Sequence, residues 1–321
     1  MSVVLSIALT TGLAALVAGA VWLLGWWRRR AQIWLAPLGV SVGFALLYWR
    51  VHGRPDFPPI DATQWVFWHA LFALPIGWLA GIKAAYRWVW AWGALLGTLW
   101  LFVPPFYNLM ESGYWSNTAG VAYIVGFALG AWLLMTLCAP LGDAAGVGTP
   151  LQMALLGGIG AGVLFYGAKS ASLAQLAGGL GGIIGVGVLL SMLRGFTLGR
   201  GALAITLFLY LSLWTTAFGF AYLTLGQLIT LYLLALVPAL HLLPALQRQS
   251  PLRRLALTLA ILIVVGGAAV GLAYNAYMFQ SLTGRLQTKT LFPEKRLAEP
   301  KKEPIVKVSR RCVCAYTILH R

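Results

Sequence analysis

The sequence predicts an all-α, polytopic membrane protein with about ten transmembrane helices. Three observations support this fold class. Apolar residues make up 60% of the 321 positions, and charged residues make up only 9%, whereas a soluble domain usually carries about a quarter charged residues. The apolar residues also form long continuous runs rather than the alternating pattern of a membrane-spanning strand. Lipid is therefore expected to replace water as the main solvent of this chain.

A helix needs about 20 mostly apolar residues to cross a hydrocarbon core of about 30 Å. Residues 1–280 are expected to form one helical transmembrane domain on this rule. Residues 281–321, which are rich in Lys, Arg and Pro, are expected to form a short, disordered, basic tail. The spans are predicted at 3–27, 31–49, 62–82, 88–106, 118–139, 150–168, 173–193, 202–223, 225–246 and 254–278.

Four of these spans begin at a sequence typical of a capping box. In this motif a Ser, Thr or Asp side chain accepts a hydrogen bond from a free N–H of the first turn, and a Gln three residues later bonds back to the cap. The four matches are Asp61-x-x-Gln64, Thr149-Pro150-x-Gln152, Ser172-x-x-Gln175 and Thr224-x-x-Gln227.

Positively charged residues in the short loops predict the orientation, because such residues stay in the cytoplasm. The first span has no basic leader before it, so we expect an uncleaved anchor with the N-terminus outside. The protein is then an integral protein of a bacterial-type plasma (inner) membrane. Its outer loops carry only Arg50, Arg54 and Lys169, and its inner loops carry Arg28, Arg29, Arg30, Lys83, Arg87, Arg194, Arg200, Arg248, Arg253 and Arg254.

The composition argues against several classes of function. The net charge of +16 does not indicate nucleic-acid binding, because the positive residues lie in loops and in the tail rather than on one soluble surface. Cys312-x-Cys314 with His320 offers too few ligands for zinc. The glycine runs lie within spans and never match a dinucleotide-binding fingerprint. We therefore expect no metal and no cofactor.

Glycines at four-residue spacing mark the sixth and seventh predicted spans. Small residues along one helix face let two backbones approach closely in lipid. The two spans are therefore expected to form a tight antiparallel hairpin. The glycines proposed for this packing are Gly158, Gly162, Gly178, Gly182 and Gly185.

Two histidines are the ionisable residues that lie well inside predicted spans, and such residues are candidates for a solute pathway. His241 lies between Pro238 and Pro244, which are expected to interrupt the ninth span and to free carbonyls that line a cavity. His69 lies about 14 Å away in depth, so the two histidines are not expected to share a metal. The alternative for each is a neutral histidine that bonds to a neighbouring helix.

The outer loop around residues 50–59 gathers Arg50, His52 and Arg54, which could bind an anionic lipid headgroup or solute. The alternative is a loop that satisfies its own polar groups while its arginines extend to lipid phosphates. Lys169 is expected only to extend to the membrane surface, and Asp143 only to form a turn.

Three functions remain open, in this order. The first is a permease or carrier for an apolar or weakly polar solute, such as a lipid. The second is a non-catalytic membrane subunit whose protein partner supplies the chemistry. An intramembrane enzyme ranks last, because acid–base chemistry needs positioned titratable groups and the spans offer only two histidines.

Overall fold

The computed structural model describes residues 3–28, 31–81, 87–144, 146–193 and 196–291. Predictions that concern Arg29, Arg30, Lys83, Arg194 and the cysteines of the tail lie outside these residues. The chain divides into two units, Met1–Tyr277 and Met278–Arg321. Its last helix continues to Leu291, so residues 281–291, which were expected to be disordered, are helical.

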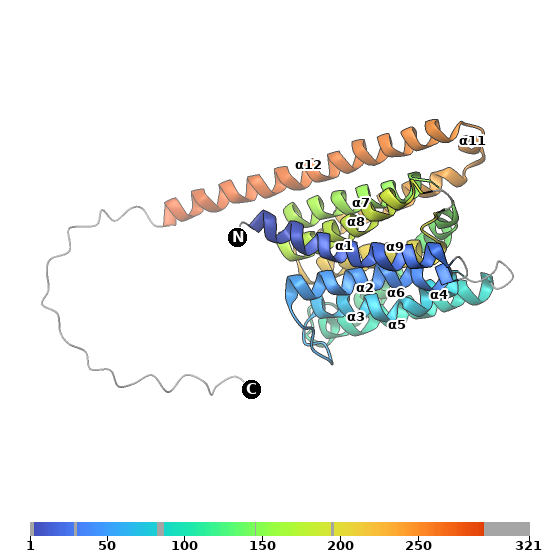
Figure 1. Ribbon diagram of the computed structural model, residues 1–321. Helices are drawn as coiled ribbons and strands as arrows, with labels where there is room; N and C mark the ends of the chain where they lie inside the picture. Colours follow the sequence, from blue (N-terminus) through green and yellow to red (C-terminus); the bar gives the residue numbers. More distant parts are fainter. Residues whose placement is uncertain (1–2, 29–30, 82–86, 145, 194–195, 292–321) are drawn as a thin grey trace, which may run out of the picture. The chain divides into compact units, whose positions relative to one another are not determined.

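Helix is the only regular secondary structure in the part of the chain that the structure describes (Figure 1). Nine of the described helical segments are long and apolar enough to cross a membrane. The elements are α1 (Val3–Trp27), α2 (Gln32–His52), α3 (Ala62–Phe72), α4 (Leu74–Ala80), α5 (Arg87–Glu111), α6 (Asn117–Cys138), η3 (Ala139–Asp143), α7 (Gly148–Tyr166), α8 (Ala171–Leu190), α9 (Arg200–Phe220), α10 (Leu225–Leu236), η4 (Val237–Leu242), α11 (Pro244–Gln247) and α12 (Pro251–Leu291).

The predicted third span is a broken helix made of α3 and α4. The break falls at Ala73, just before Pro75, which has no N–H to donate to the carbonyl of Leu71 and whose ring crowds that carbonyl. The pair still crosses the bundle. Trp68 of α3 donates to the carbonyl of Asp56 at one end, and Trp78 of α4 donates to the carbonyl of Trp34 at the other.

Helix α9 lies at the centre of the bundle. Every residue from Gly201 to Ala217 is buried. In the most apolar 18-residue stretch of α9, 89% of the residues are buried, against 17% in that of α12. A helix that is hydrophobic all round must be surrounded by other helices or by lipid. Other helices of this chain, rather than lipid, surround α9. The helices that contact it include α2, α3, α4, α6, α7, α8 and α10.

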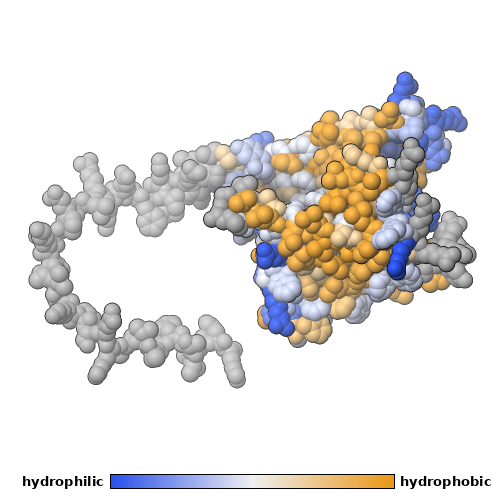
Figure 2. Space-filling model, in the orientation of Figure 1, coloured by the Kyte–Doolittle hydropathy of each residue, from blue (hydrophilic) through white to orange (hydrophobic). Residues whose placement is uncertain are grey.

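Successive spans alternate in direction, so the loops gather at two ends of the bundle. The end formed by loops 53–61, 112–116, 167–170 and 221–224 is called the Asp61 end. The opposite end, where Gly199 N–H donates to the carbonyl of Gly142, is called the Arg200 end. Figure 2 shows hydrophobic residues across the middle of one face and hydrophilic residues towards the two ends, which is the distribution that a bilayer requires.

The predicted helix starts have mixed outcomes. Thr224 and Gln227 form the full capping box, and the Asp61 carboxylate accepts the N–H groups of Thr63 and Gln64. The other two matches were wrong.

In α8 the cap is Ser170 rather than Ser172, since the Ser170 hydroxyl accepts the N–H of Leu173. Thr149 already lies inside α7, and its hydroxyl donates to the carbonyl of Leu141. Both helices begin two residues earlier than expected. In α8 two serines lie near the helix start and either could cap it, whereas α7 begins at Gly148 without a side-chain cap.

Candidate functional site

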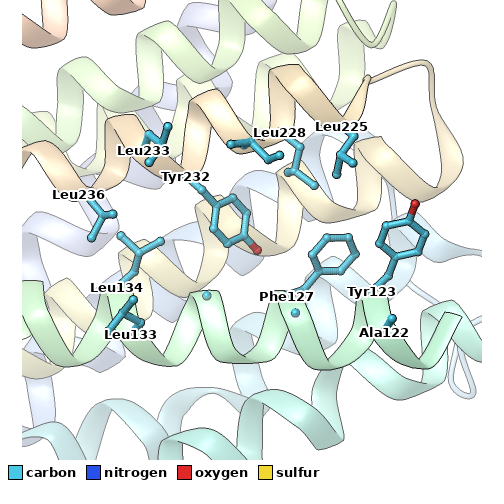
Figure 3. A pocket seen from close by; sticks show the side chains of 13 residues that line it. Ala122, Tyr123, Phe127, Leu133, Leu134, Leu225, Leu228, Tyr232, Leu233 and Leu236 are labelled. Atoms are coloured by element: carbon cyan, nitrogen blue, oxygen red, sulfur yellow. The ribbon is translucent and has the colours of Figure 1, made fainter. Parts of the chain in front are cut away.

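An apolar groove runs between α6 and α10 and has a volume of about 340 Å³. The two helices run parallel, and Figure 3 shows their side chains facing each other along its length. On α6 the lining positions recur every three or four residues, which places them on one helix face. The lining residues are Ala122, Tyr123, Gly126, Phe127, Gly130, Leu133 and Leu134 of α6, and Leu225, Leu228, Ile229, Tyr232, Leu233 and Leu236 of α10.

Small residues on α6 create the space in this groove. Ala122, Gly126 and Gly130 follow one another at four-residue spacing on the lining face. A Cβ atom added at Gly126 would meet no atom within 4 Å, whereas one added at Gly130 would lie 2.7 Å from Cε1 of Tyr232. The tyrosine ring therefore rests on Gly130 and holds α10 away from α6, while the space over Gly126 stays open.

A buried polar atom on the lining of the groove has no partner among the described residues. The Tyr232 hydroxyl is buried and makes no hydrogen bond to any described residue. Its ring lies 6.5 Å from the ring of Trp214 on α9, measured between centroids. A buried hydroxyl without a partner costs about 1–3 kcal/mol, so the packing of Tyr232 against Gly130 is not optimal for the fold alone.

Sequence reasoning did not identify this groove. A signal was present, because Gly126-x-x-x-Gly130 has the same small-residue spacing as the glycines of the next two spans. That spacing does not reveal whether the facing helix brings a small or a large residue. Here the facing residue is Tyr232, and the outcome is a groove rather than a close contact.

The predicted pathway residue His241 lies in a polar cluster near the Arg200 end, away from the groove. The Nε2 group of Gln152 donates to Nε2 of His241 at 2.8 Å and to Oγ1 of Thr258 at 2.8 Å. Because that imidazole nitrogen accepts, the ring is neutral and its proton is on Nδ1. Gln152 was interpreted as part of a capping box, yet it is 1% exposed and joins three helical segments.

The two prolines beside His241 interrupt the ninth span. Pro238 cannot donate to the carbonyl of Leu234, which accepts instead from Val237, and the helix tightens into the 3-10 segment η4. Pro244 begins α11. The expected break is therefore present, but the α6–α10 groove ends at Leu236, before His241.

His69 is fully buried and both of its ring nitrogens are bonded. Nε2 lies 2.8 Å from the carbonyl oxygen of Leu101, and Nδ1 lies 2.5 Å from Oγ of Ser212. A carbonyl only accepts, so Nε2 carries the proton and the Ser212 hydroxyl donates to Nδ1. Leu101 needs this donor because Pro105, four residues later in α5, has no N–H. His69 thus replaces a helical hydrogen bond, as membrane helices with internal proline require.

The loop at the Asp61 end satisfies its own acids. Asp56 accepts from the Gln64 amide. Burial tends to raise the pKa of Asp61, but hydrogen bonds from the Thr63 hydroxyl and from the N–H groups of Gln64 and Thr63 outweigh it and keep the pKa below its usual value.

The three residues proposed to bind anions are all exposed, but Arg50 and His52 lie in the last turn of α2 rather than in the loop. The His52 ring stacks on Tyr48 at 4.8 Å between centroids. Arg50 and Arg54 form no ion pair with any acid that the structure describes. Binding of an anionic headgroup by Arg50, His52 and Arg54 remains a prediction.

The α7–α8 hairpin is tightly packed, and its closest approach involves Gly157 and Gly181. A Cβ atom added at Gly157 would lie 2.7 Å from the Cα atom of Gly181, and one added at Gly181 would lie 2.9 Å from the carbonyl oxygen of Ala154. The backbones therefore touch where neither residue has a side chain, as close packing in lipid requires.

Of the five glycines proposed for this packing, Gly178 lies in the α7–α8 contact and the other four do not. A Cβ atom at Gly158 or Gly185 would meet no described atom within 4 Å, so these two face away from other helices. Gly178 of α8 faces Ala161 of α7 across the hairpin, whereas Gly162 faces Val270 of α12 and Gly182 faces Thr11 of α1.

A second, polar pocket of about 150 Å³ lies at the Arg200 end. Asp143 was expected only to form a turn, but its carboxylate forms an ion pair with Nε of Arg200 at 2.5 Å. Nearby, the Gln32 amide donates to the carbonyl and the hydroxyl of Thr197. These contacts join the start of α2, the end of η3, the start of α9 and the loop before α9, and the polar groups of this pocket bind one another.

Within the described residues, no group of three or more His, Cys, Asp or Glu side chains is placed to hold a metal ion. Comparison with known proteins yields no match to this chain among protein-family models, curated proteins or solved structures. The function is therefore argued from the geometry of the α6–α10 groove.

Proposed function

We propose that this multi-pass membrane protein is a carrier for a lipid-like solute whose hydrocarbon chain lies in the α6–α10 groove. The observation that carries the proposal is the groove itself, with its volume of about 340 Å³ and almost wholly apolar lining. Small-molecule sites usually measure about 300–1,000 Å³. A chain in this groove exchanges loose contacts with lipid for close contacts with protein, and dispersion favours that exchange.

The change from α-helix to 3-10 helix at the end of α10 supports a carrier rather than a fixed binding site. Leu236 is the last residue of α10 and also the last residue that lines the groove. Immediately after it the chain changes to the 3-10 segment η4. Interrupted helices of this kind border the substrate sites of many transporters. A hinge at this point allows α10 to move relative to α6 and so to open or close the groove.

Lipid movement in reconstituted vesicles tests the proposal. The probe is a phospholipid with a fluorescent acyl chain, and dithionite added outside quenches only the probe in the outer leaflet. Wild-type protein is expected to make the inner-leaflet probe accessible. Gly126→Leu is expected to return the rate to that of protein-free vesicles, because leucine fits the open space over Gly126 and fills it.

The matched control is Gly158→Leu, the same substitution at an exposed glycine on α7 that also faces open space. This variant is expected to move the probe as the wild type does. If Gly126→Leu also behaves like the wild type while remaining folded, the groove does not carry lipid and the proposal fails.

One observation favours the second candidate, a non-catalytic membrane subunit. Gly267 and Gly271 of α12 have the spacing of a close helix–helix contact, and Cβ atoms at both positions would meet no described atom within 4 Å. In that case Gly267→Leu is expected to release a stoichiometric membrane partner from the purified complex, and Gly126→Leu is expected to leave that complex intact.

A further inference from the structure

We propose that the solute is anionic and that Lys169, at the Asp61 end of the groove, binds its charged headgroup. This inference rests on the proposed function, since it concerns the molecule whose chain occupies the groove. The ligand class is a hydrocarbon chain attached to a phosphate or a carboxylate.

The groove is closed at one end. Near the Arg200 end of the groove, the thiol of Cys138 on α6 contacts the carbonyl oxygen of Ala235 on α10 at 3.7 Å. Cys138, Ala139 and Val237 are all buried there. A molecule with a polar headgroup therefore has to place that headgroup at the opposite end, beside Leu225 and Ala122, where both helices begin.

Three contacts bring Lys169 to that opposite end. The N–H of Tyr222, two residues before the Thr224 cap of α10, donates to the carbonyl of Ala168 at 3.4 Å. A Cβ atom added at Gly167 would lie 2.8 Å from Nε2 of the Gln227 side chain. Nζ of Lys169 lies 5.3 Å from the centre of the Tyr222 ring. The α7–α8 turn is thus fixed against the first turn of α10, next to Leu225.

The backbone of Lys169 is held in an unfavourable conformation. Its φ angle is +54°, and it is the only residue other than glycine with positive φ among the described residues. Residues other than Gly, Asn and Asp rarely adopt a positive φ angle. The fold therefore presents a cation where glycine would fit with less strain, and strained positions of this kind cluster at binding sites.

Charge complementarity selects an anionic headgroup. Lys169 is exposed, and no carboxylate that the structure describes forms an ion pair with it. Among the described residues, its ammonium contacts the face of the Tyr222 ring alone, which leaves it free to donate to a phosphate or carboxylate oxygen. The aliphatic part of the lysine side chain can lie along the apolar mouth while its charge stays at the membrane surface.

Lipid binding to purified protein in nanodiscs tests the inference, with native mass spectrometry as the readout. Four probes are compared: phosphatidylglycerol and phosphatidylcholine with identical acyl chains, and oleic acid and oleyl alcohol. The wild type is expected to prefer each anionic probe over its uncharged or zwitterionic counterpart by about fivefold, the usual effect of one basic residue near a membrane surface. The phospholipid pair tests binding of a phosphate headgroup, and the oleic acid–oleyl alcohol pair tests binding of a carboxylate. The pair with the larger preference shows which of the two anionic groups the protein binds.

Lys169→Gln is expected to abolish the preference while the neutral probes still bind, and Lys169→Arg is expected to retain it. Arg248→Gln, at an exposed cation on the opposite end of the bundle, serves as the matched control and is expected to keep the preference. Retention of the preference by Lys169→Gln would overturn the inference and leave the carrier proposal standing. Unchanged binding of all four probes to Gly126→Leu would overturn the carrier proposal itself.

Discussion

The α7–α8 hairpin and the α6–α10 pair both pack against α9, and both carry glycine on their contact faces, yet only one of them closes. In the hairpin Gly157 meets Gly181, and the two backbones touch. In the other pair Gly130 meets the ring of Tyr232, and a groove remains over Gly126. Glycine spacing therefore permits close packing, but the residue on the facing helix decides whether it occurs.

Buried polar groups are satisfied unevenly across the bundle. His69 of α3 and Gln152 of α7 bond to neighbouring helices. The Tyr232 hydroxyl in the open region and Nε1 of Trp214, which packs against Gly160 of the hairpin, have no partner among the described residues. Close packing of glycines therefore does not by itself satisfy the polar groups beside it.

The largest effect is expected from breaking the closed contact. Gly157→Leu places a side chain against the backbone of Gly181 and the hydroxyl of Tyr210, neither of which can easily move. We expect the free energy of unfolding to fall by about 3 kcal/mol or more. Titration from mild detergent into SDS, followed by circular dichroism, measures this loss. Gly158→Ala, at the adjacent glycine that faces open space, should change stability little.

Removing His69, which joins α3 to α5 and α9, should have the next largest effect. His69→Leu leaves the carbonyl of Leu101 without a donor and the Ser212 hydroxyl without its acceptor. The expected loss is about 2–3 kcal/mol by the same titration. Pro105→Ala restores an N–H that can donate to Leu101, so the double variant should recover part of this loss. Strict additivity of the two substitutions would contradict the role assigned to His69.

A smaller loss is expected at Gln152. Gln152→Leu removes the donors to His241 and Thr258, and Thr258 keeps its own bond to the carbonyl of Arg254. Stability should therefore fall by about 1–2 kcal/mol. Gln247→Ala removes an exposed amide that bonds to the carbonyl of Leu242 and should cost less than about 0.5 kcal/mol. Equal losses for the two variants would show that the buried cluster does not stabilise the fold.

The smallest effect, and the one of opposite sign, is expected in the open region. Tyr232→Phe removes the unpartnered hydroxyl and should raise the stability of delipidated protein by about 1 kcal/mol. Tyr210→Phe removes a hydroxyl that donates to the carbonyl of Met153 and should lower it by about 1 kcal/mol. Thermal unfolding of the two variants side by side provides the measurement. A decrease for Tyr232→Phe in delipidated protein would show that its hydroxyl already has a partner.

Much of the fold follows from local sequence. The apolar segments, the Thr224 cap and the interruption near Pro238 depend on residues close together in the chain, and the structure confirms each of them. The break between α3 and α4 was not predicted, although Pro75 provided a local signal. The groove was harder to predict, because the spacing of Gly126 and Gly130 does not reveal that Tyr232 faces them. The polar cluster was missed too, because Gln152 fitted a local motif and nothing near it in the sequence indicated His241 or Thr258.

By itself, the sequence determined that the chain spans a membrane with helices, because the free energy of placing a segment in lipid is nearly a sum over its own residues. Only the tertiary structure decided that Gly157 faces Gly181 while Gly130 faces Tyr232. It alone also brought His69 to the carbonyl that Pro105 leaves free, and Lys169 to the start of α10. These pairings join residues far apart in the chain, and no property of either partner alone specifies the other.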